Sequence, residues 1–286
     1  MRLGPPGDYL LPLPDGVEHV PDVPIGRGGT QTLHAEIVRL RVRPAAPSPV
    51  VIWLHGGGWA EGNRRRMFER VFHLAAAGYV CVAAEYRLSG VAPFPAQLLD
   101  VQCVIRWIRA HATELGVDPL RVGLWGASAG AHLAALSALR PDRGYDGDEY
   151  EEPHTYVQAV VDFFGPTDLL TAGEFEGGVV SRFEHRSANS FEGRLLGGDL
   201  KEYFPAAHKA SPLNWVGPGA PPFLIMHGAK DDVVPVSQSR RLHEKLLAAG
   251  VDSTLVVIPE GTHGTAEWEP VSLSAPKAFF DRVLKG

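Results

Sequence analysis

Cysteine is almost absent from this chain of 286 residues, which contains only Cys81 and Cys103. Two cysteines exclude a fold held together by disulfides, and because both lie in apolar stretches we expect buried, reduced thiols. A signal peptide is also lacking, since MRLGPPGDYL at the start has no apolar core, and no apolar run reaches the roughly 18 residues of a membrane span. These absences predict a cytoplasmic protein with no membrane partner.

Positive charge is scarce as well. With 27 lysine and arginine residues against 33 aspartate and glutamate residues, the net charge is -6. The one dense basic run is the three arginines at 64–66, so a nucleic-acid partner is disfavoured. The sequence has no His-Glu-x-x-His motif and no paired cysteine spacing, and the acidic residues 148–152 read as a solvated loop. We therefore expect no metal and no other cofactor.

What is present is the composition of a globular protein, with 45% hydrophobic and 21% charged residues. After a leader rich in proline and glycine, residues 1–33, apolar segments of strand length alternate with segments of helix length. This alternation predicts an α/β fold, with a mostly parallel sheet covered by helices on both faces. The expected strands are residues 34–42, 50–55, 79–83, 122–124, 157–163, 223–227 and 254–258. The expected helices are residues 68–77, 96–111, 129–139, 237–249 and 271–284.

The chain shows no internal repeat and no long linker, so we expect a single domain over residues 1–286. Residues 171–209 interrupt the alternation with clustered glycine, serine and charge around five aromatic residues, Phe175, Phe183, Phe191, Tyr203 and Phe204. A long irregular segment of this kind predicts an excursion over the edge of the sheet, which would act as a small cap.

The segment GASAG at residues 126–130 follows an apolar strand and opens a helix of small residues. This is the strand–turn–helix pattern of a nucleophile elbow, in which a serine, here Ser128, stands on a sharp turn. A side chain at position 126 or 130 would collide with the neighbouring strand and helix, which explains the two glycines. The pattern alone is weak in a chain with 32 glycines, but its place between a strand and a helix favours Ser128 as the nucleophile.

A second motif, HGGGW at residues 55–59, directly follows another apolar strand. Three glycines leave the backbone free of side chains, so amide N–H groups can point at a substrate oxygen and stabilise developing negative charge. We expect the N–H groups of Gly57, Gly58 and Ala129 to form an oxyanion hole, and a tight structural turn is the alternative. The histidine that opens the motif is expected to brace the loop rather than to act as a base.

A serine nucleophile needs a general base that is oriented by an acid, and with this type of elbow the chain order is Ser, Asp, His. Two adjacent carboxylates, Asp231 and Asp232, follow a strand that ends in a His-Gly turn. One helix and one strand later comes His263. Because the carboxyl ends of parallel strands meet at one edge of a sheet, we expect both loops to lie near Ser128.

Three other residues near these motifs have both a structural and a functional interpretation. Trp59 follows the glycine run and is a candidate substrate-binding residue, with packing in the core as the alternative. His132 lies one helical turn after Ser128, where packing under the elbow is favoured over catalysis. His227 ends a strand and is expected to hold the loop that carries Asp231.

Together these motifs resemble the serine esterases of the α/β-hydrolase superfamily that carry an HGGG oxyanion motif. This group includes hormone-sensitive-lipase-like esterases and the bacterial feruloyl- and acetyl-esterase-like carboxylesterases. The resemblance extends from about Val50 to the C-terminus. It rests on WLHGGGW at 53–59, AEYRL at 84–88, APFPAQLLD at 92–100, DPLRVGLWGASAGAHLAAL at 118–136, HGAKDDVVPVSQS at 227–239 and EGTHG at 260–264.

The resemblance implies specific roles. In that family the acid is the fourth residue after the histidine of the HG turn, which implies Asp231 as the triad acid, Asp232 as its solvent-facing neighbour and His263 as the base. Ala229 stands where the family pattern usually has an acidic residue, which affects only a loop contact. The residues before His34 are too few for a large helical cap, so the branch with a small cap fits better.

The sequence thus predicts a serine carboxylesterase that cleaves short-chain, water-soluble esters through an acyl-enzyme, with a small-molecule ester as its partner. An amidase, aryl-formamidase or peptidase using the same triad is an alternative, because the triad does not encode the leaving group. A non-catalytic small-molecule receptor of the same fold is a third hypothesis, which the intact set of Ser128, Asp231 and His263 disfavours. The sequence does not decide between a monomer and a homo-oligomer.

Overall fold

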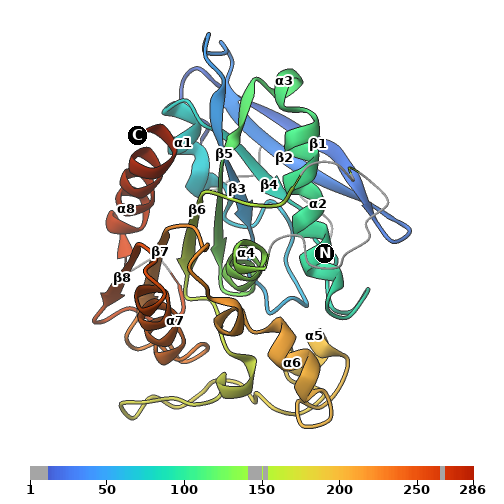
Figure 1. Cartoon of the computed structure of the whole chain (residues 1–286), viewed down its shortest axis with the longest axis vertical. Coiled ribbons are helices and arrows are strands. Elements are labelled where there is room, and N and C mark those ends of the chain that lie inside the picture. Colours follow the sequence, from blue (N-terminus) through green and yellow to red (C-terminus); the bar gives the residue numbers. More distant parts are fainter. Residues whose placement is uncertain (1–11, 141–149, 151–153, 265–267) are drawn as a thin grey trace.

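The computed structural model describes residues 12–140, 150, 154–264 and 268–286. In this part of the chain, one sheet has the strand order β1-β2-β4-β3-β5-β6-β7-β8 (Figure 1). The strands are β1 (Val17–Gly28), β2 (Gln31–Leu40), β3 (Ser48–Leu54), β4 (Val80–Ala84), β5 (Val117–Ala127), β6 (Ala159–Phe163), β7 (Phe223–Gly228) and β8 (Ser253–Ile258). Only the pairs β1–β2 and β2–β4 are antiparallel, so the predicted mostly parallel sheet is confirmed.

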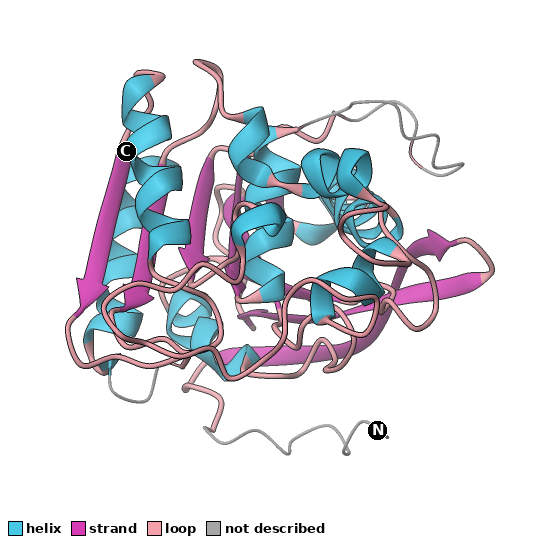
Figure 2. Cartoon of the chain, turned by 90° about the horizontal axis from the view of Figure 1, so that it is seen from below, coloured by secondary structure: helices cyan, strands magenta, loops and turns pink. Residues whose placement is uncertain are grey.

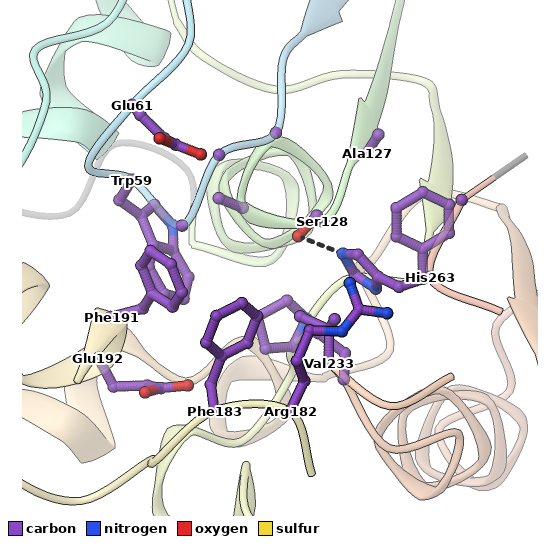
Figure 3. A pocket seen from close by; sticks show the side chains of 18 of the residues that line it. Trp59, Glu61, Ala127, Ser128, Arg182, Phe183, Phe191, Glu192, Val233 and His263 are labelled. Atoms are coloured by element: carbon purple, nitrogen blue, oxygen red, sulfur yellow. Dashed lines mark hydrogen bonds between the residues drawn. The ribbon is translucent and has the colours of Figure 1, made fainter. Parts of the chain in front are cut away.

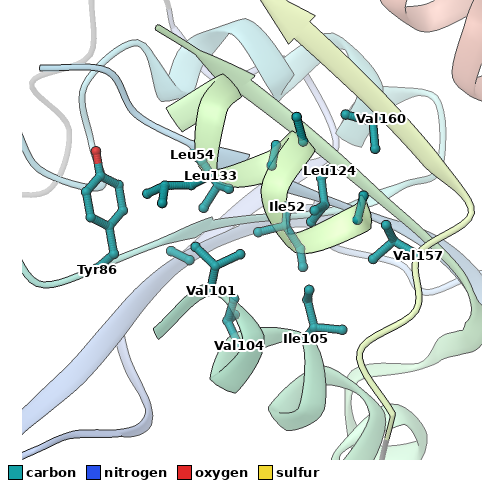
Figure 4. Packing of buried hydrophobic residues seen from close by; sticks show 14 of the residues in the cluster. Ile52, Leu54, Tyr86, Val101, Val104, Ile105, Leu124, Leu133, Val157 and Val160 are labelled. Atoms are coloured by element: carbon teal, nitrogen blue, oxygen red, sulfur yellow. The ribbon is translucent and has the colours of Figure 1, made fainter. Parts of the chain in front are cut away.

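Helices cover both faces of the sheet, as predicted. On one face, Ile52, Leu54 and Leu124 of the strands pack against α2 (Ala96–Ala110) and α4 (Ala129–Leu139), as Figure 4 shows. The spacing of Leu98, Val101, Ile105 and Ile108 predicts the buried side of α2, and all four side chains are fully buried. The same core includes residues of α7 (Ser237–Ala248), whereas α1 (Phe72–Ala76) and α8 (Val271–Phe280) form a second core on the opposite face.

The leader predicted over residues 1–33 is wrong for its second half, because residues 17–28 form the long strand β1. Prolines at 21 and 24 and a glycine at 26 argue against a strand, but β1 is an edge strand, and its register with β2 shifts beside these residues. Proline is tolerated there since an edge strand needs only half of its N–H groups for pairing. Ile25 of β1 is fully buried, so this strand belongs to the core.

Most predicted helices are present, with different ends. The helix expected over 68–77 is the short 3-10 helix η1 (Phe68–Val71) continued by α1, and the helix expected over 271–284 is α8 continued by the π-helical turn η5 (Asp281–Lys285). The short helix α3 (Ala112–Leu115) follows α2. Both cysteine thiols are buried and no disulfide joins them, as expected.

The chain leaves the sheet between β6 and β7. This excursion contains η2 (Leu169–Thr171), α5 (Phe191–Leu196), α6 (Phe204–Ala210) and η3 (Pro212–Trp215). Figure 2, seen from below, shows its loops and short helices in front of the sheet, on the side where the parallel strands end. None of the helices described here combines the length and apolar character needed to cross a bilayer.

Candidate active site

Ser128 lies between the last residue of β5 and the first residue of α4, on the turn that the sequence predicts. Its backbone has φ 54° and ψ −121°, a region that residues with a side chain rarely adopt. Two hydrogen bonds hold this conformation: the Ser128 N–H donates to Phe163 O over 2.8 Å, and the Ser128 carbonyl accepts from His132 N over 3.0 Å. The strained turn presents the hydroxyl to a cavity.

Gly126 and Gly130 flank the turn where α4 approaches the strands. A Cβ added at Gly126 would lie 2.3 Å from the carbonyl carbon of Gly130, and one added at Gly130 would lie 2.1 Å from Leu54 O. Both distances are far below van der Waals contact, so the collisions predicted from the sequence are confirmed. The close approach of helix and strand requires glycine at both positions.

We expect Gly126→Ala to lower the free energy of unfolding by about 1–3 kcal/mol or more, because the added methyl group meets rigid backbone. Gly90→Ala is the matched control, since a Cβ there has open space around it. Its effect should stay within about 0.5 kcal/mol. Urea unfolding of both variants checks this expectation, and equal midpoints for the two would contradict it.

Ser128, Asp231 and His263 come together at the carboxyl ends of β5, β7 and β8. The His263 Nε2 atom lies 3.1 Å from Ser128 Oγ, a contact marked by the dashed line in Figure 3. The His263 Nδ1 atom lies 2.7 Å from Asp231 Oδ2. Since a carboxylate only accepts, Nδ1 carries the proton and Nε2 faces the serine as an acceptor. This geometry suits proton transfer from the hydroxyl to the imidazole.

The carboxylate of Asp231 is almost fully buried, and the groups that contact it stabilise its charge. Oδ1 accepts from the N–H groups of Val233 and Val234, both at 2.8 Å, and Oδ2 lies 3.3 Å from His227 Nε2 as well as near His263. Burial by itself raises the pKa of Asp231, but hydrogen bonds from the two histidines outweigh it and hold the pKa well below its usual range. Asp231 is therefore ionised wherever the protein is folded near neutral pH.

The neighbours of Asp231 hold its loop in place. His227 contacts Ser239 Oγ through Nδ1 at 2.7 Å and Val234 O through Nε2 at 2.9 Å, so its predicted role in holding this loop is confirmed. Asp232 turns the other way and forms a bidentate ion pair with Arg182, at 2.8 to 3.0 Å. Of the two adjacent carboxylates, only Asp231 reaches the imidazole.

Gly57 and Gly58 line the cavity beside Ser128 and Ala129. Gly57 has a φ of 130°, and a Cβ added there would lie 2.1 Å from Glu61 O. Gly58 has a φ of 56°, and a Cβ added there would lie 2.2 Å from the Phe191 ring. In the described part of the chain, no backbone carbonyl accepts from the N–H groups of Gly57, Gly58 or Ala129. These donors are free to bind an oxygen that develops negative charge near Ser128.

His55 braces the glycine loop. Its Nδ1 atom lies 2.8 Å from Gly56 O, its ring stacks on Tyr86 with centroids 4.4 Å apart, and the Tyr86 hydroxyl donates to His55 O over 2.8 Å. Burial lowers the pKa of His55 to about 4, so the ring is neutral at physiological pH. The side chain is a structural support, as the sequence suggests.

Trp59 and His132 form a bridge from the glycine loop to the cap. The Trp59 indole N–H donates to His132 Nδ1 over 3.1 Å, so the proton of His132 is on Nε2 and donates to Ala210 O over 2.7 Å. Burial lowers the pKa of His132 to about 4, and its expected packing under the elbow is confirmed. Trp59 is 2% exposed yet lines the cavity, so it is both packed and within reach of a ligand.

The arginine run after the glycine loop is tied to the antiparallel edge of the sheet. Glu36 of β2 is fully buried, and its Oε1 accepts from Arg64 Nε at 2.8 Å and from Arg65 Nε at 3.0 Å. Its Oε2 lies 2.6 Å from His19 Nε2 of β1. Strand β1, which the sequence does not predict, thus helps to anchor the loop that carries Gly57 and Gly58.

The cavity has a volume of about 360 Å³ and opens onto Ser128 and His263 (Figure 3). The cap supplies part of its wall, including the aromatic side chains of Phe183 and Phe191. Phe164 packs edge-on against His263, with ring centroids 4.6 Å apart. No pattern in the sequence predicts this contact. The position of the Phe164 ring depends on the backbone after β6, where Phe164 has a positive φ of 45°.

Three further cap residues in the wall, Arg182, His185 and Glu192, were not predicted from the sequence. Of the other cap aromatics, Tyr203 and Phe204 are 39% and 54% exposed and do not line the cavity. Among the described residues, no three His, Cys, Asp or Glu side chains cluster so that they could hold a metal ion.

Comparison with known proteins agrees with this geometry. A model of the BD-FAE family matches residues 39–246. The chain belongs to the BD-FAE family. Esterase LipQ of Mycobacterium tuberculosis is 34% identical over 230 residues, a match that covers 80% of this chain and 53% of LipQ. The chain therefore spans about half the length of this curated relative.

Solved structures similar to this BD-FAE chain have the α/β-hydrolase fold, as predicted. A truncated carbohydrate esterase from gut microbiota superimposes with a TM-score of 0.81 at 26% identity, over 94% of this chain and 97% of that one. Esterase Est2 of Thermogutta terrifontis, solved with butyrate bound, superimposes with a TM-score of 0.75 at 26% identity, over 94% of both chains.

Proposed function

We propose that this chain is a serine carboxylesterase with Ser128 as nucleophile, His263 as general base and Asp231 as the acid that orients it. The observation that carries the proposal is the continuous contact from Asp231 Oδ2 through His263 to Ser128 Oγ, at 2.7 and 3.1 Å. Membership of the BD-FAE family and similarity to Esterase LipQ support hydrolysis of carboxylic esters.

The reaction follows from the geometry. His263 Nε2 takes the proton of Ser128 while Oγ attacks the ester carbonyl, and the oxyanion accepts hydrogen bonds from Gly57, Gly58 and Ala129. As the tetrahedral intermediate collapses, His263 returns the proton to the departing alcohol oxygen and an acyl-enzyme remains. Water then gives a proton to His263 and attacks the acyl carbon. As the second tetrahedral intermediate collapses, His263 returns that proton to Ser128 Oγ, and the acid and the free serine are released.

Substrate class is tested with matched p-nitrophenyl esters and anilides of the same acyl groups. We expect turnover of the esters to exceed that of the anilides by orders of magnitude. A preference for the anilides would favour the amidase alternative, and binding without turnover would favour the receptor alternative.

An organophosphate should label Ser128 and no other serine.

We expect kcat/KM for an ester to fall as the pH is lowered below neutral, because the base must be neutral to accept the serine proton. The other titratable groups near the site do not explain a fall in kcat/KM at acid pH. Asp231 stays ionised just below neutral pH, and burial keeps His55 and His132 neutral with pKa values of about 4.

The pH profile needs a control for Asp162, because burial raises the pKa of this carboxyl group to about 6. Its Oδ1 accepts from Gly165 N at 2.8 Å, and Asp162 does not line the cavity. We expect the fall in kcat/KM at acid pH to persist in the Asp162→Asn variant. A flat profile in the wild type, with the chemical step limiting, would contradict the proposed role of His263.

Chain-length preference follows from the cavity. A fully buried methylene contributes about 0.8 kcal/mol, but a cavity of about 360 Å³ is near the lower end of the size range of ligand sites, so a long chain would extend beyond its wall. We expect kcat/KM to be highest between acetyl and hexanoyl esters, with no activation at an oil–water interface. The butyrate in Est2 supports this range. An optimum at lauroyl or longer would contradict it.

The single-domain organisation and the cytoplasmic location stay predictions. The one continuous sheet from β1 to β8 supports the first.

A further inference from the structure

Trp59, directly after the two cavity-lining glycines of the glycine loop, has a strained backbone. Its φ is 56°, in the left-handed region that residues with a side chain rarely adopt. Such a conformation costs energy and persists only where surrounding contacts hold it. The Trp59 carbonyl accepts from Ser89 N over 2.7 Å, and the indole N–H donates to His132 Nδ1 over 3.1 Å. These two hydrogen bonds therefore hold the backbone next to Gly57 and Gly58.

The contact between Trp59 and His132 is shielded from water. Trp59 is 2% exposed, His132 is fully buried, and their rings meet edge to face with centroids 4.9 Å apart. Figure 3 shows Trp59 on the side of the cavity opposite His263. A buried N–H group without an acceptor is unfavourable, so the indole is held at His132. Because burial lowers the pKa of His132 to about 4, Nδ1 stays an acceptor at neutral pH.

His132 joins this contact to two other parts of the site. Its backbone N–H donates to Ser128 O over 3.0 Å, at the nucleophile elbow. Its Nε2–H group donates to Ala210 O over 2.7 Å. Ala210 is the last residue of α6, where the carbonyl groups of a helix lack partners within the helix. One buried residue thus links the glycine loop, the elbow and the cap.

We propose that His132 is a positioning residue that fixes the distance between Ser128 and the N–H groups of Gly57 and Gly58, acting through the indole N–H of Trp59. This inference rests on the proposed esterase function. A shift of the two N–H groups weakens their hydrogen bonds to the oxyanion, which forms only as the serine attacks. The loss therefore falls on kcat rather than on KM.

Trp59→Phe removes the indole N–H but keeps an aromatic ring in the wall of the cavity. We expect kcat for p-nitrophenyl butyrate to fall by about 10- to 100-fold, with KM within about threefold of the wild type. Trp215→Phe is the matched control, because its indole N–H donates to Lys209 O over 2.9 Å and Trp215 does not line the cavity. The control should keep the wild-type kcat.

Two variants of His132 separate the glycine loop from the cap. In His132→Gln an amide N–H₂ group reaches Ala210 O from the position of Nε2, but no acceptor remains at the position of Nδ1. In His132→Asn the amide oxygen takes the position of Nδ1 and accepts from Trp59, whereas Ala210 O loses its donor. We expect kcat to fall in His132→Gln as it does in Trp59→Phe, and His132→Asn to restore most of it.

Thermal unfolding of both variants distinguishes positioning from support of the fold. We expect His132→Asn to be no more stable than His132→Gln, because the shorter side chain leaves a cavity and an unpaired carbonyl. A residue that only supports the fold would make kcat follow stability, so the less stable variant would also be the slower one.

The trifluoromethyl ketone analogue of a butyrate ester reports on the oxyanion hole directly. Ser128 Oγ adds to the ketone carbon, its proton passes to His263, and the ketone oxygen becomes an oxyanion. We expect the inhibition constant to rise in Trp59→Phe and in His132→Gln by about the factor by which kcat/KM falls, since both quantities depend on the same N–H donors.

A wild-type kcat in folded Trp59→Phe would overturn the proposal, and so would an inhibition constant that stays unchanged while kcat falls. If Trp59→Phe does not fold, the two His132 variants decide, because an equal loss of kcat in both would exclude the indole contact as the cause. A wild type that neither hydrolysed p-nitrophenyl butyrate nor bound the ketone would instead count against the esterase function itself.

Discussion

Ser128→Ala is expected to reduce kcat for p-nitrophenyl esters by about four to six orders of magnitude, because no other group near His263 can form the acyl-enzyme. The hydroxyl makes one side-chain hydrogen bond, to His263 Nε2, so its removal should leave the fold intact. Steady-state kinetics on the purified variant measure the loss, and thermal unfolding at the wild-type temperature shows that the protein is folded. A folded variant with near-wild-type turnover would rule out Ser128 as the nucleophile.

A comparison of Asp231→Asn with Asp232→Asn should give the second largest effect. In Asp231→Asn the amide oxygen must stay at the Oδ1 position, because two backbone N–H groups, those of Val233 and Val234, point there. The amide N–H₂ group then faces His263 Nδ1 and forces the proton onto Nε2, where it blocks proton transfer from Ser128. We expect a loss of about 10⁴-fold in kcat.

Asp232→Asn is the matched control on the adjacent residue. Its side chain contacts Arg182 on the outside of the loop, and no contact joins it to His263. We expect a change in kcat of less than about tenfold for this variant. The measurement is single-turnover kinetics on both variants, and the reverse ranking would show that Asp232 orients the imidazole.

Local patterns in the sequence were enough to predict the parallel part of the sheet and the elbow. The strands β3, β4, β6 and β7 are buried along their whole length, and such strands read as continuous apolar runs. Gly126 is required by a contact within one strand–turn–helix unit, where an added Cβ would meet Gly130, whereas the contact that requires Gly130 is with Leu54 of the neighbouring strand β3. The choice of Asp231 over Asp232 came from the family resemblance, since nothing local distinguishes two adjacent carboxylates.

The ends and edges of the fold were less predictable. The strand β1 contains prolines and a glycine that locally disfavour a strand, yet pairing with β2 and burial of Ile25 outweigh that preference. The sequence likewise shows Arg64 only as part of a basic run. Its burial against Glu36, on a strand distant in sequence, becomes visible only when the two segments are packed together.

The sequence by itself determined the chemistry proposed for this protein: a serine on an elbow, a glycine loop of N–H donors, and an acid and a histidine in the expected order. Tertiary structure alone decided how these groups are supported and what surrounds the substrate. Phe164 against His263 and the link from Trp59 through His132 to the cap both join residues from separate elements. Such contacts depend on how the elements pack, which is not a property of any local pattern.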